Sequence, residues 1–265
     1  MIQHRWELWL IGWAGAAALL AALYLVQRRT RDATAVDAGW ASSLVLIAVL
    51  CAILGPGHAS HRILIAVIAG LENLRIASLV RGRLGKGEDS RYQELRSRWK
   101  ARGREQLTFA IFYQTQALVA AALTVPFVLA VFNRHHGLEP FEWAGAALWL
   151  VAAPLEALAD RQLKRFKADP ANKGRTMRYG LWHYSRHPNY FFQWLTWVAY
   201  ALVALAAPWG WLGLTAPALI LYLILFVTGV KPAEEAAVKS RGDDFRRYQQ
   251  ETSAFVPWFP KSSTA

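Results

Sequence analysis

The chain has 265 residues, of which 55% are hydrophobic and 18% are charged, whereas soluble domains average about 25% charged residues. Its 30 Lys and Arg outnumber its 18 Asp and Glu, which gives a formal net charge of +12. An apolar and basic chain must segregate its charges into loops between apolar blocks, which indicates a membrane protein and excludes a disordered one. The single cysteine, Cys51, excludes a disulfide framework, a multi-cysteine zinc site and an iron–sulfur cluster.

Seven apolar blocks follow one another, and most are long enough to cross a hydrocarbon core as helices. The first lacks a basic start and a small-residue cleavage site, so it is not expected to be a removable signal peptide. The second is short and ends at the turn signal Gly55-Pro56-Gly57. The sequence therefore predicts an all-α polytopic membrane protein, a single domain over 1–265, with spans at about 6–26, 40–54, 63–80, 107–132, 141–159, 190–207 and 209–230.

The basic residues predict the orientation of these spans. The connections after the first, third and fifth spans and the tail carry three, nine, eight and six Lys and Arg. The connections after the second, fourth and sixth carry one, one and none. By the positive-inside rule, the N-terminus is expected outside, and the C-terminus, the loops 81–106 and 160–189 and the tail 231–265 on the cytoplasmic side.

Several classes of site find no support. The basic residues are divided among several loops, which does not favour a nucleic-acid-binding module. His183 and His187 are four residues apart, but Pro188 and the lack of clustered ligands speak against zinc, and His135-His136 falls on the other predicted side. There is no glycine-rich Rossmann fingerprint and no P-loop, so a nucleotide would have to be held by the loops of the membrane domain.

Ionisable side chains inside predicted spans are candidates for function, because they are costly there unless paired or facing a polar cavity. Glu72 and Arg75 are three residues apart, so they could equally neutralise each other on one helical face. Asp37 stands at the entry to the second span, and Asp160 at the end of the fifth, four residues after Glu156.

The densest polar segment runs from Tyr179 to Tyr190, with the sequence YGLWHYSRHPNY. Its Pro188 is expected to break the helix just before a span, where non-helical backbone must be buried in protein or line a cavity. Arginine forks fit phosphate oxygens, so the basic residues upstream suit a phosphorylated ligand. These residues are Lys164, Arg165, Lys167, Lys173, Arg175 and Arg178.

This segment resembles the steroid 5α-reductase family, in particular its bacterial multispan branch, through the pattern Gly-Leu-Trp-x-x-Ser-Arg-His-Pro-Asn-Tyr at 180–190. The Arg-His-Pro-Asn-Tyr portion is shared with sterol C14 reductases and isoprenylcysteine carboxyl methyltransferases. The resemblance covers most of the chain, although Gln193 stands where relatives commonly have an acid. Further matches are Val36-Asp37-x-x-Trp40, Gly87-Glu88-Asp89-x-Arg91-Tyr92, Asp160-x-Gln162, and the tail Glu234-Glu235, Tyr248 and Pro257.

The resemblance implies an NADPH-dependent reduction of the C4–C5 double bond of a 3-oxo-Δ4-steroid or a similar lipid enone. Hydride addition to the β-carbon builds negative charge on the carbonyl oxygen, which a well-placed proton donor stabilises by roughly 3–4 kcal/mol. By position, Asp37 and Glu72 are the candidate catalytic residues, and in an apolar setting each is expected to hold a proton for donation.

For NADPH the resemblance implies a set of ten binding residues and no metal. Asn189 is expected on the nicotinamide side, Asp160 on a ribose or amide, and the basic residues on the phosphates. The full set is Asp160, Lys164, Arg175, Arg178, His187, Asn189, Tyr190, Glu234, Glu235 and Tyr248.

The expected partners are a steroid or other lipid enone, membrane lipids and no nucleic acid, for a monomer in the bacterial inner membrane. Two other functions remain open. One is an S-adenosylmethionine-dependent membrane methyltransferase, because the superfamily shares the Arg-His-Pro and Glu-Glu elements. The other is a non-enzymatic lipid-binding or transport protein.

Overall fold

The structure is a computed structural model that describes residues 2–82, 84, 85 and 87–261. Positions 83, 86 and 262–265, which belong to the predicted loop 81–106 and tail 231–265, lie outside the described residues. Within the described part of the chain every regular element is a helix, so the predicted all-α class is confirmed. The chain divides into two compact units, unit 1 (Met1–Trp143 and Tyr200–Ala216) and unit 2 (Ala144–Ala199 and Pro217–Ala265).

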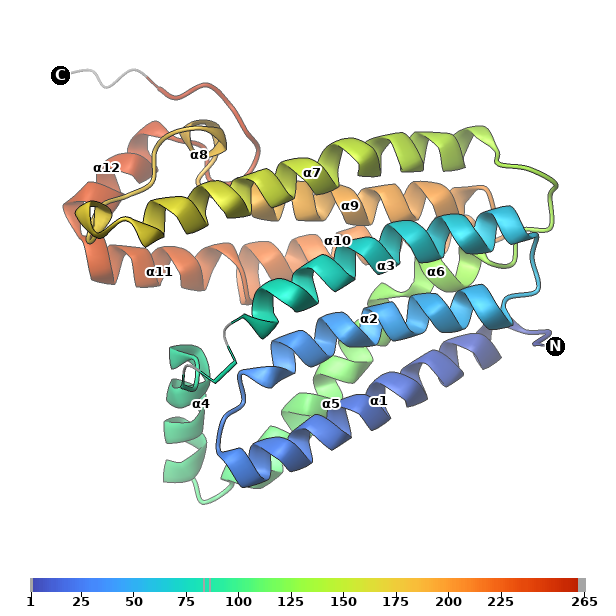
Figure 1. Cartoon of the computed structure of the whole chain (residues 1–265), viewed down its shortest axis with the longest axis horizontal. Coiled ribbons are helices and arrows are strands. Elements are labelled where there is room, and N and C mark those ends of the chain that lie inside the picture. Colours follow the sequence, from blue (N-terminus) through green and yellow to red (C-terminus); the bar gives the residue numbers. More distant parts are fainter. Residues whose placement is uncertain (1, 83, 86, 262–265) are drawn as a thin grey trace. The chain divides into compact units, whose positions relative to one another are not determined.

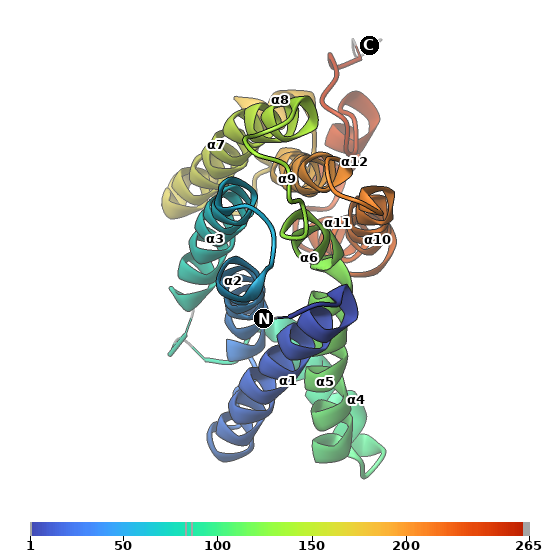
Figure 2. The same ribbon diagram turned by 90° about the vertical axis from the view of Figure 1, so that its right-hand side faces the viewer.

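Unit 1 is built on four long helices, α1 (Arg5–Thr30), α2 (Ala35–Leu54), α3 (Ala59–Arg81) and α5 (Glu105–Leu123). The helix α1 packs against α2 and α5, and α2 packs against α3 (Figures 1 and 2). Two shorter helices complete it, α4 (Ser90–Ala101) between α3 and α5, and α6 (Val125–Ala130) after α5. The apolar face of each long helix is buried in the unit, while large apolar side chains such as Ile53, Ile63 and Leu107 remain exposed, as lipid contact would require.

At one end of unit 1, the connections that follow the second, fourth and sixth predicted spans lie close together. The backbone N–H of Gly57 donates to the carbonyl of Val131 at 2.9 Å, and that of His58 donates to the carbonyl of Asn133 at 2.9 Å. The side-chain amide of Asn133 donates in turn to the carbonyl of Ala206 at 3.2 Å. The connections that follow the second, fourth and sixth predicted spans are therefore held together.

Another group of contacts joins the connections after the first and third predicted spans. The N–H of Ala33 donates to the Glu88 carboxylate at 2.9 Å, and Arg31 forms an ion pair with Glu105 at 3.0 Å. Within unit 1, each set of connections thus gathers at its own end, as an alternating series of spans requires.

The remaining elements follow in chain order. They are α7 (Pro140–Ala168), the 3₁₀ turn η1 (Pro170–Asn172), α8 (Leu181–Tyr184), α9 (Pro188–Leu205), the 3₁₀ turn η2 (Gly210–Leu214), α10 (Thr215–Tyr222), the π-helical turn η3 (Leu223–Val227), α11 (Val230–Arg241) and α12 (Asp243–Glu251). In unit 2, the Trp194 indole on α9 donates to the carbonyl of Pro217 on α10 at 3.2 Å.

The helix from α10 to α11 is interrupted in its middle. The N–H of Thr228 donates to the carbonyl of Leu223, five residues earlier, at 2.8 Å, which is the pattern of a π turn. A side chain at Gly229 would place its Cβ 2.4 Å from the carbonyl oxygen of Ile224, so the turn can close only over a glycine. The chain therefore changes direction locally before α11 begins.

Among the described residues, six helices are long and apolar enough to cross a membrane, namely Arg5–Thr30, Ala35–Leu54, Ala59–Arg81, Glu105–Ala130, Pro140–Ala168 and Gly210–Arg241. They cover six of the seven predicted spans. The sixth predicted span, 190–207, forms α9, which is not among the six because its 18 residues include Asn189 and Gln193 in the first turns. Seven spans and their orientation stay a prediction.

Helix continues beyond two of the predicted spans. The helix of the fifth predicted span, 141–159, continues to Ala168, and helix resumes after the seventh predicted span as α11 to Arg241. In both places the added turns are polar, because a helix can leave the apolar layer without unwinding while hydropathy marks only its apolar part.

Candidate functional site

The break before α9 is held by a buried serine. Ser185 follows α8 and is fully buried; its hydroxyl donates to the carbonyl of Phe255 at 2.8 Å and accepts from the N–H of His187 at 3.1 Å. Pro188 then begins α9, a position where its missing N–H costs nothing. The sequence Ser-Arg-His-Pro therefore makes a short fixed turn between two helices.

A glycine at the start of α8 allows a second close approach. Gly180 has φ of +62°, and a Cβ there would lie 2.5 Å from the side-chain nitrogen of Gln162. Gln162 Oε1 accepts from the N–H of Leu181 at 3.0 Å. The Gly-Leu-Trp motif thus packs against Gln162 of α7. Gln162 belongs to Asp160-x-Gln162, another of the motifs matched in the sequence.

The Glu234 carboxylate on α11 is the centre of the polar cluster. One oxygen, Oε1, accepts from Arg186 Nε at 2.7 Å and lies 3.2 Å from His187 Nε2. The other, Oε2, accepts from the Gln249 amide at 2.7 Å. Arg186 also donates to the backbone carbonyls of Gln249 and Thr252. One arginine therefore connects the turn before α9 with α11 and the end of α12.

A second arginine fastens the loop 173–180 to α12. Arg178 forms ion pairs with Asp244 at 2.9 Å and Glu251 at 3.0 Å, and its guanidinium lies 5.5 Å from the centre of the Tyr248 ring. Burial would raise the pKa of Asp244, but the hydrogen bond from Thr176 and the charge of Arg178 outweigh it and hold this pKa below its ordinary value of 3.8.

Tyr248 is buried beneath this ion pair. Its hydroxyl donates to the carbonyl of Trp182 and lies 3.2 Å from the carbonyl oxygen of Ser185, at the end of α8. Burial raises the pKa of Tyr248, so the phenol stays protonated and remains a donor at neutral pH.

Asp160 and Asn189 come together from α7 and α9. The Asn189 side-chain nitrogen donates to Asp160 Oδ1 at 3.1 Å. The Asn189 side-chain oxygen is buried, and among the described residues no donor reaches it. A buried acceptor without a donor is costly in a folded protein, so it indicates a place for a ligand N–H.

The neighbouring side chains of the motif stack on each other. The rings of His187 and Tyr190 lie 5.4 Å apart at an interplanar angle of 3°. Asp160, Arg178, Asn189, Glu234 and Tyr248 also make hydrogen bonds or ion pairs in this part of unit 2, so seven of the ten predicted cofactor residues have such contacts here.

The other three are placed differently. Lys164, Arg175 and Glu235 are exposed, and no side-chain contact joins them to the cluster in the part of the chain that the structure describes. The two basic residues keep their charges available, whereas Arg178 and Arg186 are engaged with carboxylates.

Four contributing residues were absent from the predicted set, namely Arg186, Asp244, Gln249 and Glu251. Arg186 stands inside the recognised motif and could have been included from its position beside His187. The other three lie on α12, whose sequence is a polar run without a span or motif boundary, so their pairing depends on tertiary contacts.

A hollow of about 510 Å³ lies beside Arg186 in unit 2. Its lining comes from the end of α12 and the tail that follows, including Gln249, Thr252, Val256 and Trp258. The tail is fixed there, because the N–H of Trp258 donates to the carbonyl of Tyr184 at 2.8 Å.

The two predicted catalytic residues lie in unit 1. Asp37, in the first turn of α2, accepts hydrogen bonds from the Tyr92 hydroxyl and from Arg91 at 2.9 Å. Burial, followed by the negative charge of Asp37, raises the pKa of Tyr92, so its phenol stays protonated. Two residues of the Gly-Glu-Asp-x-Arg-Tyr motif, Arg91 and Tyr92, thus contact Asp37.

Glu72 is buried on α3 and accepts from Arg75 at 2.7 Å. The ion pair that the i, i+3 spacing of Glu72 and Arg75 allows is therefore present. In the described structure no hydrogen bond or ion pair joins Glu72 to Asp37.

Comparison with known proteins gives one result. Residues 23–252 match the family described as "Protein of unknown function (DUF1295)". The match begins within α1 and ends just after α12, so it includes both the Asp37 contacts and the Glu234 cluster. No curated protein and no solved structure matches the chain. Because the match covers most of the sequence, the chain belongs to the DUF1295 family.

Proposed function

We propose that this protein is a membrane-embedded reductase that uses NADPH to reduce the C4–C5 double bond of a 3-oxo-Δ4-steroid or a similar lipid enone. The motifs that resemble the steroid 5α-reductase family support this, because their residues make polar contacts in unit 2: Asp160 with Asn189, His187 with Glu234, and Tyr248 with the backbone of the motif. The observation that carries the proposal is the buried Asn189 side-chain oxygen, which no described donor reaches.

The residues fit a nicotinamide. A carboxamide presents two N–H donors and one acceptor, and Asn189 Oδ1 offers the acceptor that such a donor needs. The Asp160 carboxylate beside it fixes the orientation of Asn189 by accepting from its nitrogen at 3.1 Å, so the oxygen is left for the ligand.

The phosphates would be met by the exposed cations. Lys164 and Arg175 are exposed and unengaged within the described chain, so they can reach a phosphate without breaking an ion pair. Arg178 and Arg186 would instead maintain the shape of the cluster through Asp244, Glu251 and Glu234.

When bound, NADPH supplies the hydride that adds to the β-carbon of the enone. The protein would stabilise the negative charge that then develops on the carbonyl oxygen. We propose Asp37 and Glu72 for this step, acting with the donors that they hold, the Tyr92 hydroxyl and the Arg75 guanidinium. The α-carbon takes its proton ultimately from water.

We further propose seven spans in a bacterial inner membrane, with the N-terminus outside and the C-terminus cytoplasmic. The contact of Asn133 with Ala206 supports a crossing by α9, because it holds the chain after α9 beside the connections that follow α2 and α6. The distribution of Lys and Arg supports the orientation. We expect the protein to act as a monomer.

The proposal is tested by truncating the amide of Asn189. Asn189→Ala should weaken NADPH binding about 10- to 100-fold, because a ligand N–H loses its buried acceptor. Isothermal titration of the purified full chain in detergent measures the affinity, and the fall in nicotinamide absorbance with a panel of enones measures turnover.

The matched control is Asn172→Ala, which removes the same amide from the η1 turn, where it donates to the carbonyl of Phe166. This variant should bind NADPH like the wild type. Normal NADPH affinity in Asn189→Ala would remove that residue from the site. A wild-type protein that binds S-adenosylmethionine and ignores NADPH would replace the reductase by a methyltransferase.

A further inference from the structure

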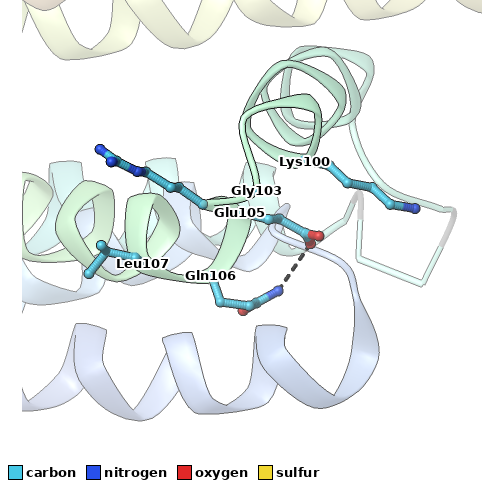
Figure 3. A pocket seen from close by; sticks show the side chains of 6 residues that line it. Lys100, Gly103, Glu105, Gln106 and Leu107 are labelled. Carbon is cyan, nitrogen blue, oxygen red and sulfur yellow. Dashed lines mark hydrogen bonds between the residues drawn. The ribbon is translucent and has the colours of Figure 1, made fainter.

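A second hollow lies in unit 1, where α4 ends and α5 begins. It has a volume of about 400 Å³ and is lined by Lys100, Gly103, Arg104, Glu105, Gln106 and Leu107 (Figure 3). Neither the motifs of the sequence nor the proposed reductase site includes these residues.

The charge of this hollow is positive because its carboxylate is already neutralised. Glu105 accepts from Arg31 at 3.0 Å and from Arg96, and the Gln106 amide donates to it at 3.0 Å (Figure 3). In the described chain no carboxylate pairs with Lys100 or Arg104. The two cations at the rim are therefore available to an anion.

The platform that carries these cations is fixed. The Trp99 ring meets the Phe109 ring edge-on at 4.7 Å, which attaches the last turn of α4 to α5. Arg96 bridges Glu88 and Glu105, with 2.6 Å to Glu88. The short connection that carries Gly103 and Arg104 is thus held between two helices that pack on each other.

Below the cations, the surface becomes apolar. Leu107 lines the hollow and is 61% exposed, and Ile111, four residues later on the same face of α5, is 57% exposed. The helix α5 opens a span, Glu105–Ala130, so this face passes from the polar end of the span into its apolar part. A ligand that fits has an anionic head above hydrocarbon.

We propose that this hollow binds an anionic phospholipid, with its phosphate attracted by the exposed cations Lys100 and Arg104 of the lining and an acyl chain along Leu107 and Ile111. A free phosphate would use only the cations and would leave the apolar half of the hollow without a partner. A zwitterionic lipid would satisfy the apolar half but would bring its own cation to a positive rim.

The test compares two variants that remove the same charge. Lys100→Gln with Arg104→Gln removes the cations of the hollow, and Arg98→Gln with Arg102→Gln removes two cations from the same segment outside it. Native mass spectrometry of the full chain measures binding of phosphatidylglycerol, of phosphatidylcholine with the same acyl chains, and of inorganic phosphate.

The first variant should bind phosphatidylglycerol roughly 25-fold more weakly, at about fivefold for each cation, while the second should bind it like the wild type. Equal losses in both variants would show diffuse surface charge and would overturn the site. So would wild-type binding of phosphatidylcholine or inorganic phosphate as tight as that of phosphatidylglycerol. NADPH affinity should be unchanged in both variants, so the outcome does not depend on the reductase proposal.

Discussion

At the scale of single residues, the polar cluster of unit 2 depends on groups that have few substitutes. Arg186 uses its planar fork to reach the Glu234 carboxylate and two backbone carbonyls, which a lysine ammonium could not do in the same geometry. Gly180 is a further such residue, because both its backbone conformation and the space beside it exclude a side chain.

Gly180→Ala is therefore expected to destabilise the protein by about 1–3 kcal/mol, since a non-glycine residue must adopt a strained conformation and its Cβ must displace Gln162. Gly174→Ala is the matched control, because Gly174 also has a positive φ, +79°, but has open space around it. Thermal unfolding in detergent should show the larger loss for Gly180→Ala. Equal losses would mean that the contact with Gln162 contributes nothing.

Candidate site residues that lie within a recognisable motif could be selected from the sequence. The Ser-Arg-His-Pro-Asn turn places His187 and Asn189 locally, and each meets a carboxylate from another matching motif, Glu234 and Asp160 respectively. Asp244 and Gln249 could not be predicted, because a polar residue on a polar helix carries no signal of the partner that it will meet. The partner of Glu72, by contrast, could be foreseen, because its i, i+3 spacing from Arg75 allows an ion pair on one helical face.

At the scale of elements, α12 is the helix that ties the loop 173–180 to the C-terminal part of unit 2. Its first turn presents Asp244, which accepts from the N–H of Thr176 at 2.8 Å and pairs with Arg178. The apolar helices were predictable from hydropathy, whereas α4, α8, α11 and α12 were not, because they are short or polar. Three of them are anchored by an aromatic residue of their own, Trp99 on α4, Trp182 on α8 and Tyr248 on α12.

The docking of α12 should depend on pH through Asp244. Its pKa is lower in the folded protein than its ordinary value of 3.8, so the stabilisation is fully present above that value and is lost as the pH falls through the folded pKa. The pair is about one-third exposed, so the contribution is on the order of 1 kcal/mol at most.

Asp244→Asn should accordingly lower the unfolding temperature at pH 6 and should lose this difference at acid pH, where the wild-type carboxyl is also neutral. Thermal unfolding of both proteins from pH 6 down to the acid limit measures this. The control is Asp243→Asn, an exposed neighbour on the same turn. A difference that persists unchanged at acid pH would exclude the ion pair as its cause.

At the scale of the whole molecule, the number of crossings determines on which side the tail lies. In the part of the chain that the structure describes, six helices meet the length and composition of a span, and the predicted seventh crossing depends on α9. The first turns of α9 carry the polar side chains Asn189 and Gln193, which lower its mean hydropathy. Hydropathy alone therefore cannot decide whether α9 crosses the membrane.

Labelling of single cysteines tests the topology. Cys51 is the only cysteine, so Cys51→Ala gives a background into which Ser97→Cys, His136→Cys and Lys239→Cys are introduced at exposed positions. An impermeant maleimide should label His136→Cys on intact cells, and the other two only after lysis. Labelling of Lys239→Cys on intact cells would indicate six crossings and a tail on the outside.

The π turn at Leu223–Val227 makes the spacing of the chain as important as its chemistry. A π turn contains one residue more than an α turn, and each residue of an α-helix advances the helix by about 100°. Loss of one residue here would let the segment close as ordinary α-helix and would swing Glu234 by that angle, away from Arg186 and His187. Relatives that keep the Glu–Arg–His contact are therefore free to exchange side chains in this stretch but are not free to shorten it.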